Sequence, residues 1–155
     1  MKKVICILLV IITIFSGCAA EKPNTNISPK TDGIIIALLD TGISTVAIDE
    51  NRILAGYNYV ENSYDTEDKI NHGTASASVI VGSAPAKIEG LAPDAYLVPL
   101  VVRTKTEDGE QKGISAQTLA QVIIDCVDKY HANIINISLG IKKDVEEVKR
   151  AIDYV

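Results

Sequence analysis

Two residues whose side chains can do acid–base chemistry stand at defined places in this sequence. Asp40 closes the apolar run of residues 34–39, and His72 opens the segment Asn71-His72-Gly73-Thr74. A carboxylate and an imidazole are the side chains that most often carry acid–base chemistry in enzymes. Asp40 and His72 are therefore the candidate catalytic residues.

Apolar patterns predict the elements that must hold these two side chains. Residues 34–39 are typical of a buried parallel strand, whose carboxyl end is where α/β folds place their active sites. The small residues after His72 favour a helix that packs closely against a sheet, with His72 in its first turn. There the positive end of the helix dipole disfavours an imidazolium, so we expect a neutral ring that can accept a proton.

Short apolar runs alternate with helical stripes along the rest of the chain, which is typical of an α/β domain with a mainly parallel sheet. Residues 95–102 and 133–138 are predicted strands, and Pro99 indicates an edge or a bulge in the first of them. Residues 115–130 carry an apolar stripe at helical spacing, with Ser115 as N-cap and Cys126 as a small buried hydrophobe.

The last segment predicts one more helix. Asp144 and Glu147 form a capping-box pattern, and Val148, Ile152 and Val155 share one face. A crossover helix in a parallel sheet normally leads into another strand, and neither a glycine C-cap nor a basic last turn closes this one. We therefore expect a fold that is incomplete at its carboxyl end.

The amino terminus carries an export pattern. Lys2 and Lys3 precede an apolar run over residues 4–15, which is too short for a membrane span and predicts a signal peptide at 1–17. The segment Phe15-Ser16-Gly17-Cys18 resembles a bacterial lipobox, which implies lipidation of Cys18, a polar tether at 18–32 and an extracytoplasmic, membrane-anchored lipoprotein. A plain signal peptide with an incidental cysteine is the alternative.

Composition excludes some partners. The chain has 20 acidic and 15 basic residues and a net charge of −5, which argues against binding to nucleic acid or to an anionic lipid surface. Its three cysteines give no disulfide framework, because one lies in the predicted signal and one is the predicted lipidation site. His131, at the end of a predicted helix, is interpreted as a structural residue.

Four motifs together resemble the subtilisin-like serine proteases, peptidase family S8, from Gly33 to the end of the chain. They are Asp40-Thr41-Gly42, His72-Gly73-Thr74, Gly90-Leu91-Ala92-Pro93 and Asn136-Ile137-Ser138-Leu139-Gly140. The resemblance implies a three-layer α/β fold in which Asp40 orients His72, and His72 acts as general base and then general acid. It also implies that Ser138, Leu139 and Gly140 bind the backbone of a peptide or protein substrate, with Asp108-Gly109-Glu110-Gln111 either as the opposite edge or as an ordinary solvated turn.

The same resemblance shows what the 155 residues lack. No Gly-Thr-Ser nucleophile segment and no oxyanion-hole asparagine of the family pattern are present. Residues 33–155 are thus predicted to be a partial peptidase domain, inactive alone, with a second polypeptide as one way to complete it. Asp49 falls where many relatives carry a calcium ligand, but residues 83–89 lack the asparagine pattern that completes that site, so we expect no cofactor and no metal.

The segment around Asp40 also resembles motifs of other protein classes. Asp40-Thr41-Gly42 after an apolar run also resembles the active-site strand of retroviral-type aspartic proteases, which need two such aspartates and a β-rich fold, and an actin-like phosphate loop is a weaker match. A catalytically dead, membrane-tethered peptide-binding lipoprotein is the alternative of a different class. The intact Asp40 and His72 favour a fragment of an active enzyme over this binder.

Overall fold

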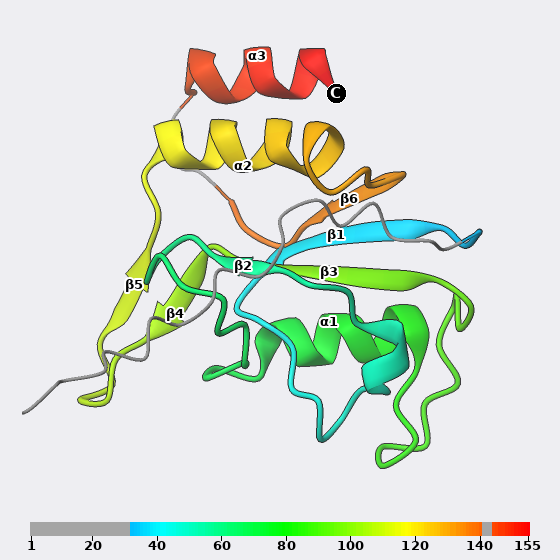
Figure 1. Ribbon diagram of the computed structural model, residues 1–155. Coiled ribbons are helices and arrows are strands. Elements are labelled where there is room, and N and C mark those ends of the chain that lie inside the picture. Colours follow the sequence, from blue (N-terminus) through cyan, green and yellow to red (C-terminus); the bar gives the residue numbers. More distant parts are fainter. Residues whose placement is uncertain (1–31, 141–143) are drawn as a thin grey trace, which may run out of the picture.

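The computed structural model describes residues 32–140 and 144–155, so the predicted signal peptide at 1–17, Cys18 and nearly all of the tether at 18–32 lie outside the described residues. Figure 1 shows the elements in space. In chain order they are β1 (Ile35–Asp40), the 3-10 helix η1 (Glu50–Arg52), β2 (Tyr57–Asn58), α1 (His72–Val81), β3 (Tyr96–Val101), β4 (Arg103–Lys105), β5 (Gln111–Gly113), α2 (Ala116–Asp128), β6 (Ile134–Ile137) and α3 (Glu146–Tyr154).

The main sheet has the strand order β2-β3-β1-β6, and every pairing within it is parallel. Ala37 of β1 lies opposite Val98 of β3 on one side and Ile135 of β6 on the other. This arrangement confirms the predicted α/β class with a mainly parallel sheet. The sequence did not indicate the separate two-stranded antiparallel sheet of β4 and β5.

Alternate residues of β1 face the two sides of the sheet, as the period of two in a strand requires. Ala37 and Leu39 pack in the core cluster that includes α2 and α3, whereas Ile36 and Leu38 pack in a second cluster with α1. Figure 1 shows α1 covering one face of the sheet and α2 the other, with α3 stacked outside α2. Asp40 shares the parity of Ile36 and Leu38, so its side chain lies on the face that α1 covers.

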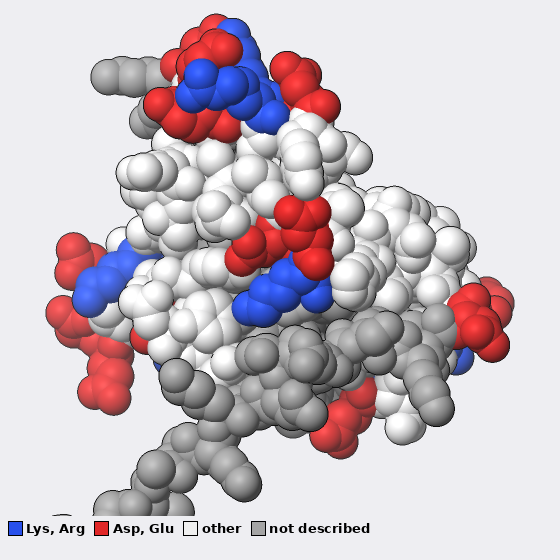
Figure 2. Space-filling view, turned by 45° about the horizontal axis from the view of Figure 1, so that its top comes forward, with Lys and Arg blue, Asp and Glu red and all other residues white. Residues whose placement is uncertain are grey.

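Charged side chains on the face shown in Figure 2 lie in small groups of both signs, with broad uncharged surface between them. The ion pairs of the structure include Arg52 with Asp94 at 3.4 Å and Lys149 with Asp144 at 2.6 Å. In the part of the chain that the structure describes, no helix is both long and apolar enough to cross a membrane.

Helix α2 follows the sequence prediction closely. The Ser115 hydroxyl accepts a hydrogen bond from the Thr118 backbone nitrogen at 3.0 Å, which confirms the predicted N-cap. Cys126 is fully buried, as expected for a small hydrophobe on the apolar stripe. The helix ends at Asp128, and His131 lies beyond it in a left-handed turn with a φ of 53°.

The prediction of an edge or bulge at Pro99 is wrong. Pro99 lies inside β3, paired with Leu38 of β1, and β2 pairs with the other side of the same strand. Backbone nitrogens of Leu54 and Tyr59 donate to the carbonyls of Leu97 and Val101, so the odd-numbered residues of β3 face β2. The two-residue pairing of β2 begins only at Leu100, so the missing N–H of Pro99 interrupts no ladder there.

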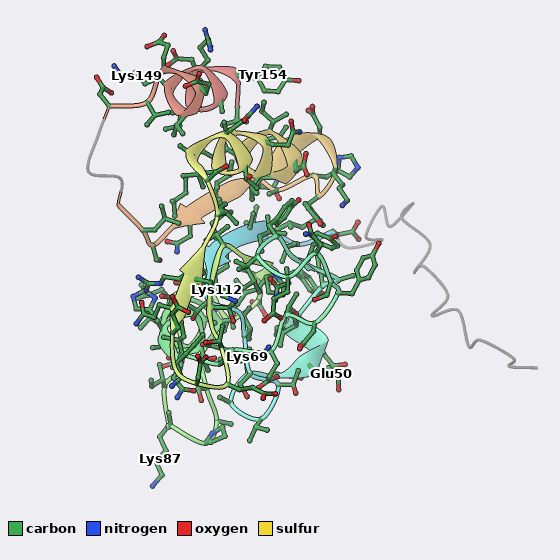
Figure 3. All side chains as sticks on the ribbon, turned by 90° about the vertical axis from the view of Figure 1, so that its left-hand side faces the viewer. Glu50, Lys69, Lys87, Lys112, Lys149 and Tyr154 are labelled. Atoms are coloured by element: carbon green, nitrogen blue, oxygen red, sulfur yellow. The ribbon has the colours of Figure 1, made fainter. Side chains whose placement is uncertain are left out.

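The predicted capping box of α3 is also wrong. Val145 is the N-cap and makes no side-chain cap bond, while Asp144 lies one residue before this N-cap and pairs with Lys149 instead. Figure 3 shows α3 above α2 with Lys149 and Tyr154 labelled on it. Val148 is buried as predicted, but Ile152 is 54% exposed, because the narrow contact with α2 covers only the Val148 and Ala151 stripe.

Candidate active site

The structure brings Asp40 and His72 into direct contact. Nδ1 of His72 lies 2.7 Å from Oδ1 of Asp40, at the junction between the carboxyl end of β1 and the first residue of α1. The Asp40 side chain is 1% exposed, whereas that of His72 is 47% exposed. One ring nitrogen is thus held by a buried carboxylate while the ring itself reaches the surface.

Further donors fix the Asp40 carboxylate. The Thr41 backbone nitrogen donates to Oδ1 at 2.7 Å, and the Ser76 hydroxyl lies 3.1 Å from Oδ2, within donating distance. Ser76 stands one helical turn after His72, so the same helix supplies the imidazole and a hydroxyl to one carboxylate. A buried carboxylate is stable only when its oxygens are satisfied in this way. Sequence reasoning missed Ser76, because a serine among small helical residues carries no signal of its own.

Two glycines allow the strand end and the helix start to approach this closely. A Cβ on Gly73 would lie 2.2 Å from the Gly42 carbonyl oxygen, and one on Gly42 would lie 2.4 Å from that of Thr66. Gly42 also has a φ of +114°, which L side chains rarely adopt. The glycine after His72 and the glycine two residues after Asp40 are therefore required by the geometry that joins the pair.

The proposed substrate residues follow β6 directly. The strand ends at Ile137, so Ser138, Leu139 and Gly140 are not part of the regular sheet, in contrast to the predicted strand end at Ser138. The Ser138 backbone nitrogen still donates to the carbonyl of Leu39, the residue before Asp40, at 3.4 Å. The structure thus places this segment next to the carboxyl end of β1, with Gly140 exposed and nothing within 4 Å of its would-be Cβ.

The segment Asp108-Gly109-Glu110-Gln111 turns between β4 and β5. The Thr106 backbone nitrogen donates to the Glu110 carbonyl at 2.9 Å, and Gly109 takes a φ of +90°. Strand β5 is exposed along its whole length. The segment is therefore a closed hairpin turn beside an exposed strand.

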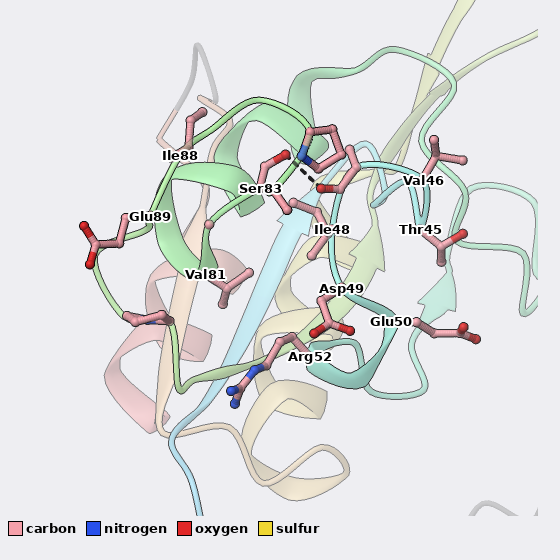
Figure 4. A pocket seen from close by; sticks show the side chains of 15 residues that line it. Thr45, Val46, Ile48, Asp49, Glu50, Arg52, Val81, Ser83, Ile88 and Glu89 are labelled. Atoms are coloured by element: carbon pink, nitrogen blue, oxygen red, sulfur yellow. Dashed lines mark hydrogen bonds between the residues drawn. The ribbon is translucent and has the colours of Figure 1, made fainter.

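Asp49, which the family resemblance places at a calcium-ligand position, lies at the start of η1. Asp49 caps η1 by accepting bonds from the backbone and side-chain nitrogens of Asn51, at 3.0 and 2.9 Å. Ala47 and Ser83 line a cleft of about 540 Å³ that Asp49 also lines, and the Ser83 hydroxyl donates a hydrogen bond to the Ala47 carbonyl there (Figure 4). Within the described residues, no three His, Cys, Asp or Glu side chains are grouped as metal ligands.

Comparisons with known proteins agree with this geometry. The family model described as the subtilase family, Peptidase_S8, matches residues 31–155. The thermophilic serine proteinase of Bacillus sp. (strain AK1) is 30% identical over 132 residues, covering 83% of this chain and 31% of that protein. The major intracellular serine protease of Bacillus subtilis (strain 168) is 34% identical over 129 residues, covering 79% of this chain and 39% of that protein.

A solved structure gives the same result. Fervidolysin from Fervidobacterium pennivorans, described as a keratinolytic enzyme related to subtilisin, superimposes with a TM-score of 0.66 at 29% identity, over 78% of this chain and 19% of that one. The chain therefore spans about a third of the two curated relatives, 31% and 39% of their lengths. With the acid–imidazole contact, the parallel sheet and a family match that runs to the last residue, this chain belongs to the subtilase family of serine proteases.

Proposed function

We propose that this chain supplies the aspartate and the histidine of a serine endopeptidase that hydrolyses peptide bonds in its complete form. The observation that carries the proposal is the 2.7 Å contact between His72 Nδ1 and the buried Asp40 carboxylate. Because that carboxylate is acceptor-only, Nδ1 carries the proton and Nε2 is left as the basic nitrogen. Family membership supports the same chemistry.

In this mechanism the two residues have separate roles. His72 Nε2 takes the proton of an attacking hydroxyl and later gives it to the leaving amine, while Asp40 keeps the ring in one tautomer and stabilises the imidazolium that forms. The half-exposed ring gives Nε2 access to substrate, and the 1% exposure of Asp40 keeps water from competing for its oxygens.

The nucleophile must come from sequence other than these 155 residues, which hold no Gly-Thr-Ser segment. We therefore propose that this chain alone is inactive and that a further segment, in the same or a second polypeptide, completes the domain. Strand β6 supports this proposal, because β1 is its only neighbour among the described residues and Ile134 is 51% exposed. A strand added beside β6 would cover this apolar edge.

Substrate binding is assigned to the segment after β6. Ser138, Leu139 and Gly140 lie beside the end of β1, and the open space around Gly140 leaves its backbone free to pair with an extended peptide. Such pairing forms hydrogen bonds to the main chain of the substrate rather than to its side chains, so the complete enzyme would accept many peptide or protein sequences. Charged groups of mixed sign in Figure 2 support the absence of a nucleic-acid partner.

The proposed location is outside the cytoplasmic membrane, anchored by lipid on Cys18. The support is the apolar leader followed by Ser16-Gly17-Cys18. Family membership does not decide the compartment, because one relative is named as intracellular. Metabolic labelling with a palmitate analogue should mark the parent chain, and the Cys18→Ala variant should carry no label.

A catalytically dead, membrane-tethered peptide-binding lipoprotein is the second candidate, favoured by the missing serine together with a retained substrate segment. The nucleotide sequence just downstream distinguishes the two candidates: a Gly-Thr-Ser segment in any reading frame supports the enzyme, and its absence supports the binder. Fluorophosphonate labelling tests the first candidate in the protein. The purified 155-residue chain should give no adduct, and a labelled serine would overturn the assignment of an external nucleophile.

A further inference from the structure

Asp68 is a buried carboxylate with an unusually complete set of donors. Its Oδ1 accepts hydrogen bonds from the backbone nitrogens of Ile70 and Asn71, at 2.9 and 2.8 Å, and from the Thr41 hydroxyl at 2.8 Å. Its Oδ2 accepts from the Thr74 backbone nitrogen at 2.8 Å and from the Thr74 hydroxyl at 2.7 Å. The residue is 7% exposed, and no described Lys, Arg or His forms an ion pair with it.

These bonds cap the helix that carries His72. The N-cap residue Asn71 has a left-handed conformation with a φ of 70° and makes no side-chain cap bond of its own. The free backbone nitrogens of the first turn are taken up instead by side chains from outside the helix, Thr74 by Asp68 and Gly73 by the Thr41 hydroxyl at 2.9 Å. The orientation of this turn is thus set by residues that are not part of it.

Thr41 joins the two halves of the site. Its single hydroxyl proton goes to Asp68, which can only accept, so the same oxygen is free to accept from Gly73. Thr41 also directly follows Asp40 and donates its backbone nitrogen to the Asp40 carboxylate at 2.7 Å. An unbroken set of hydrogen bonds, none longer than 2.9 Å, therefore runs from Asp68 through Thr41 to Asp40 on one side and to the residue after His72 on the other.

We propose that Asp68 is a positioning residue for the Asp40–His72 pair, acting through the Thr41 hydroxyl and the first turn of α1. The inference rests on the proposed function, because it assigns Asp68 a part in holding the same acid–imidazole pair. Asp68 does not touch the reacting atoms. An asparagine at this position keeps the shape of the side chain but loses one acceptor. Its NH₂ group must face either the Thr74 donors or those of Ile70 and Asn71, and a donor facing a donor forms no hydrogen bond.

The test is the ¹H–¹⁵N NMR spectrum of the histidine rings in the purified chain. The sequence has only two histidines, so a His72→Ala variant assigns both. In the parent chain we expect a low-field Nδ1–H signal from His72, caused by its short bond to Asp40. Asp68→Asn should abolish this signal or move it to higher field, whereas the backbone amide signals of β1 and β3 keep their positions.

A matched control is Asp125→Asn, which alters another hydrogen-bonded carboxylate on α2, away from the pair, and should leave the His72 signal unchanged. If Asp68→Asn does not fold, Thr41→Val decides, because it removes only the linking hydroxyl and should also weaken the signal. An unchanged His72 signal in Thr41→Val, or in a folded Asp68→Asn, overturns the role of Asp68 and leaves the proposed function standing. A parent chain without the low-field signal overturns the acid–imidazole pair itself.

Discussion

Replacing Gly73 by alanine tests the close approach on which the site depends. In an ordinary helix this change stabilises by about 1 kcal/mol, because glycine is the poorer helix former. Here the new methyl carbon would lie 2.2 Å from the Gly42 carbonyl oxygen and 3.2 Å from the Asp40 Cβ, whereas ordinary contact begins near 3.4 Å. The neighbouring atoms belong mostly to backbone and cannot rotate away, so the helix and the Gly42 turn must separate.

The size of the effect follows from these two opposing terms. Overpacking of this kind costs about 1–3 kcal/mol, and contact with backbone favours the upper end of that range. After the gain in helix propensity is subtracted, Gly73→Ala should lower the free energy of unfolding by about 2 kcal/mol. A retreat of roughly 1 Å would also take His72 Nδ1 out of hydrogen-bond range of Asp40, because the present contact is 2.7 Å.

Urea unfolding of the purified chain, followed by circular dichroism, measures the first effect, and the histidine NMR signal measures the second. Gly140→Ala is the matched control, because its new methyl group would meet nothing within 4 Å and the change should be close to neutral. A Gly73→Ala chain as stable as the parent, with the His72 signal intact, would refute the argument that this glycine is required by close packing.

Three other predictions concern groups outside the reacting pair. Burial raises the pKa of Asp68, but the hydrogen bonds from Thr74, Ile70 and Thr41 outweigh it, so the folded-state pKa lies below the ordinary value. The stabilisation from this carboxylate is therefore present above about pH 4 and is lost as the pH falls through the folded-state pKa. On acidification, the midpoint of urea unfolding should fall more in the parent chain than in Asp68→Asn. Burial, with the charge of Asp125, raises the pKa of the Cys126 thiol to about 12, so Ellman's reagent at pH 8 should react with it only after unfolding. Tyr59→Phe removes a 2.7 Å hydrogen bond to the Asp125 carboxylate and should cost about 1.5 kcal/mol in urea unfolding, and no loss would mean that the bond is not formed in solution.

Much of the scaffold could be predicted, because local patterns determine it. The apolar run before Asp40 forms a strand whose two faces are both buried, and its short length and its β-branched isoleucines favour a strand over a helix. Helix α2 was predictable because a single stripe packs on the sheet and Ser115 caps its first turn. His72 falls at the first position of α1, as the small residues after it indicate.

What the sequence did not reveal depends on contacts between distant segments. Asp68 and Ser76 have ordinary neighbours in the chain, and only folding turns their side chains toward Thr41 and Asp40. Pro99 was misread because an interior strand normally needs every N–H, and nothing local shows that the facing segment begins its pairing one residue later. The N-cap of α3 is Val145 rather than Asp144, whose carboxylate pairs with Lys149, a contact that the capping-box pattern does not indicate.

The most direct test of the central claim is a chimera in which residues 31–155 replace the matching part of the Bacillus subtilis intracellular relative, which supplies the remaining sequence. We expect the chimera to hydrolyse a peptide substrate and to be labelled by a fluorophosphonate. In subtilisin itself, a member of the same family, removing the histidine lowers kcat by about 10⁶-fold, so His72→Ala should cause a loss of that order. His131→Ala, the other histidine, should leave kcat unchanged. An active chimera in which His72→Ala performs as well as His131→Ala would contradict the account.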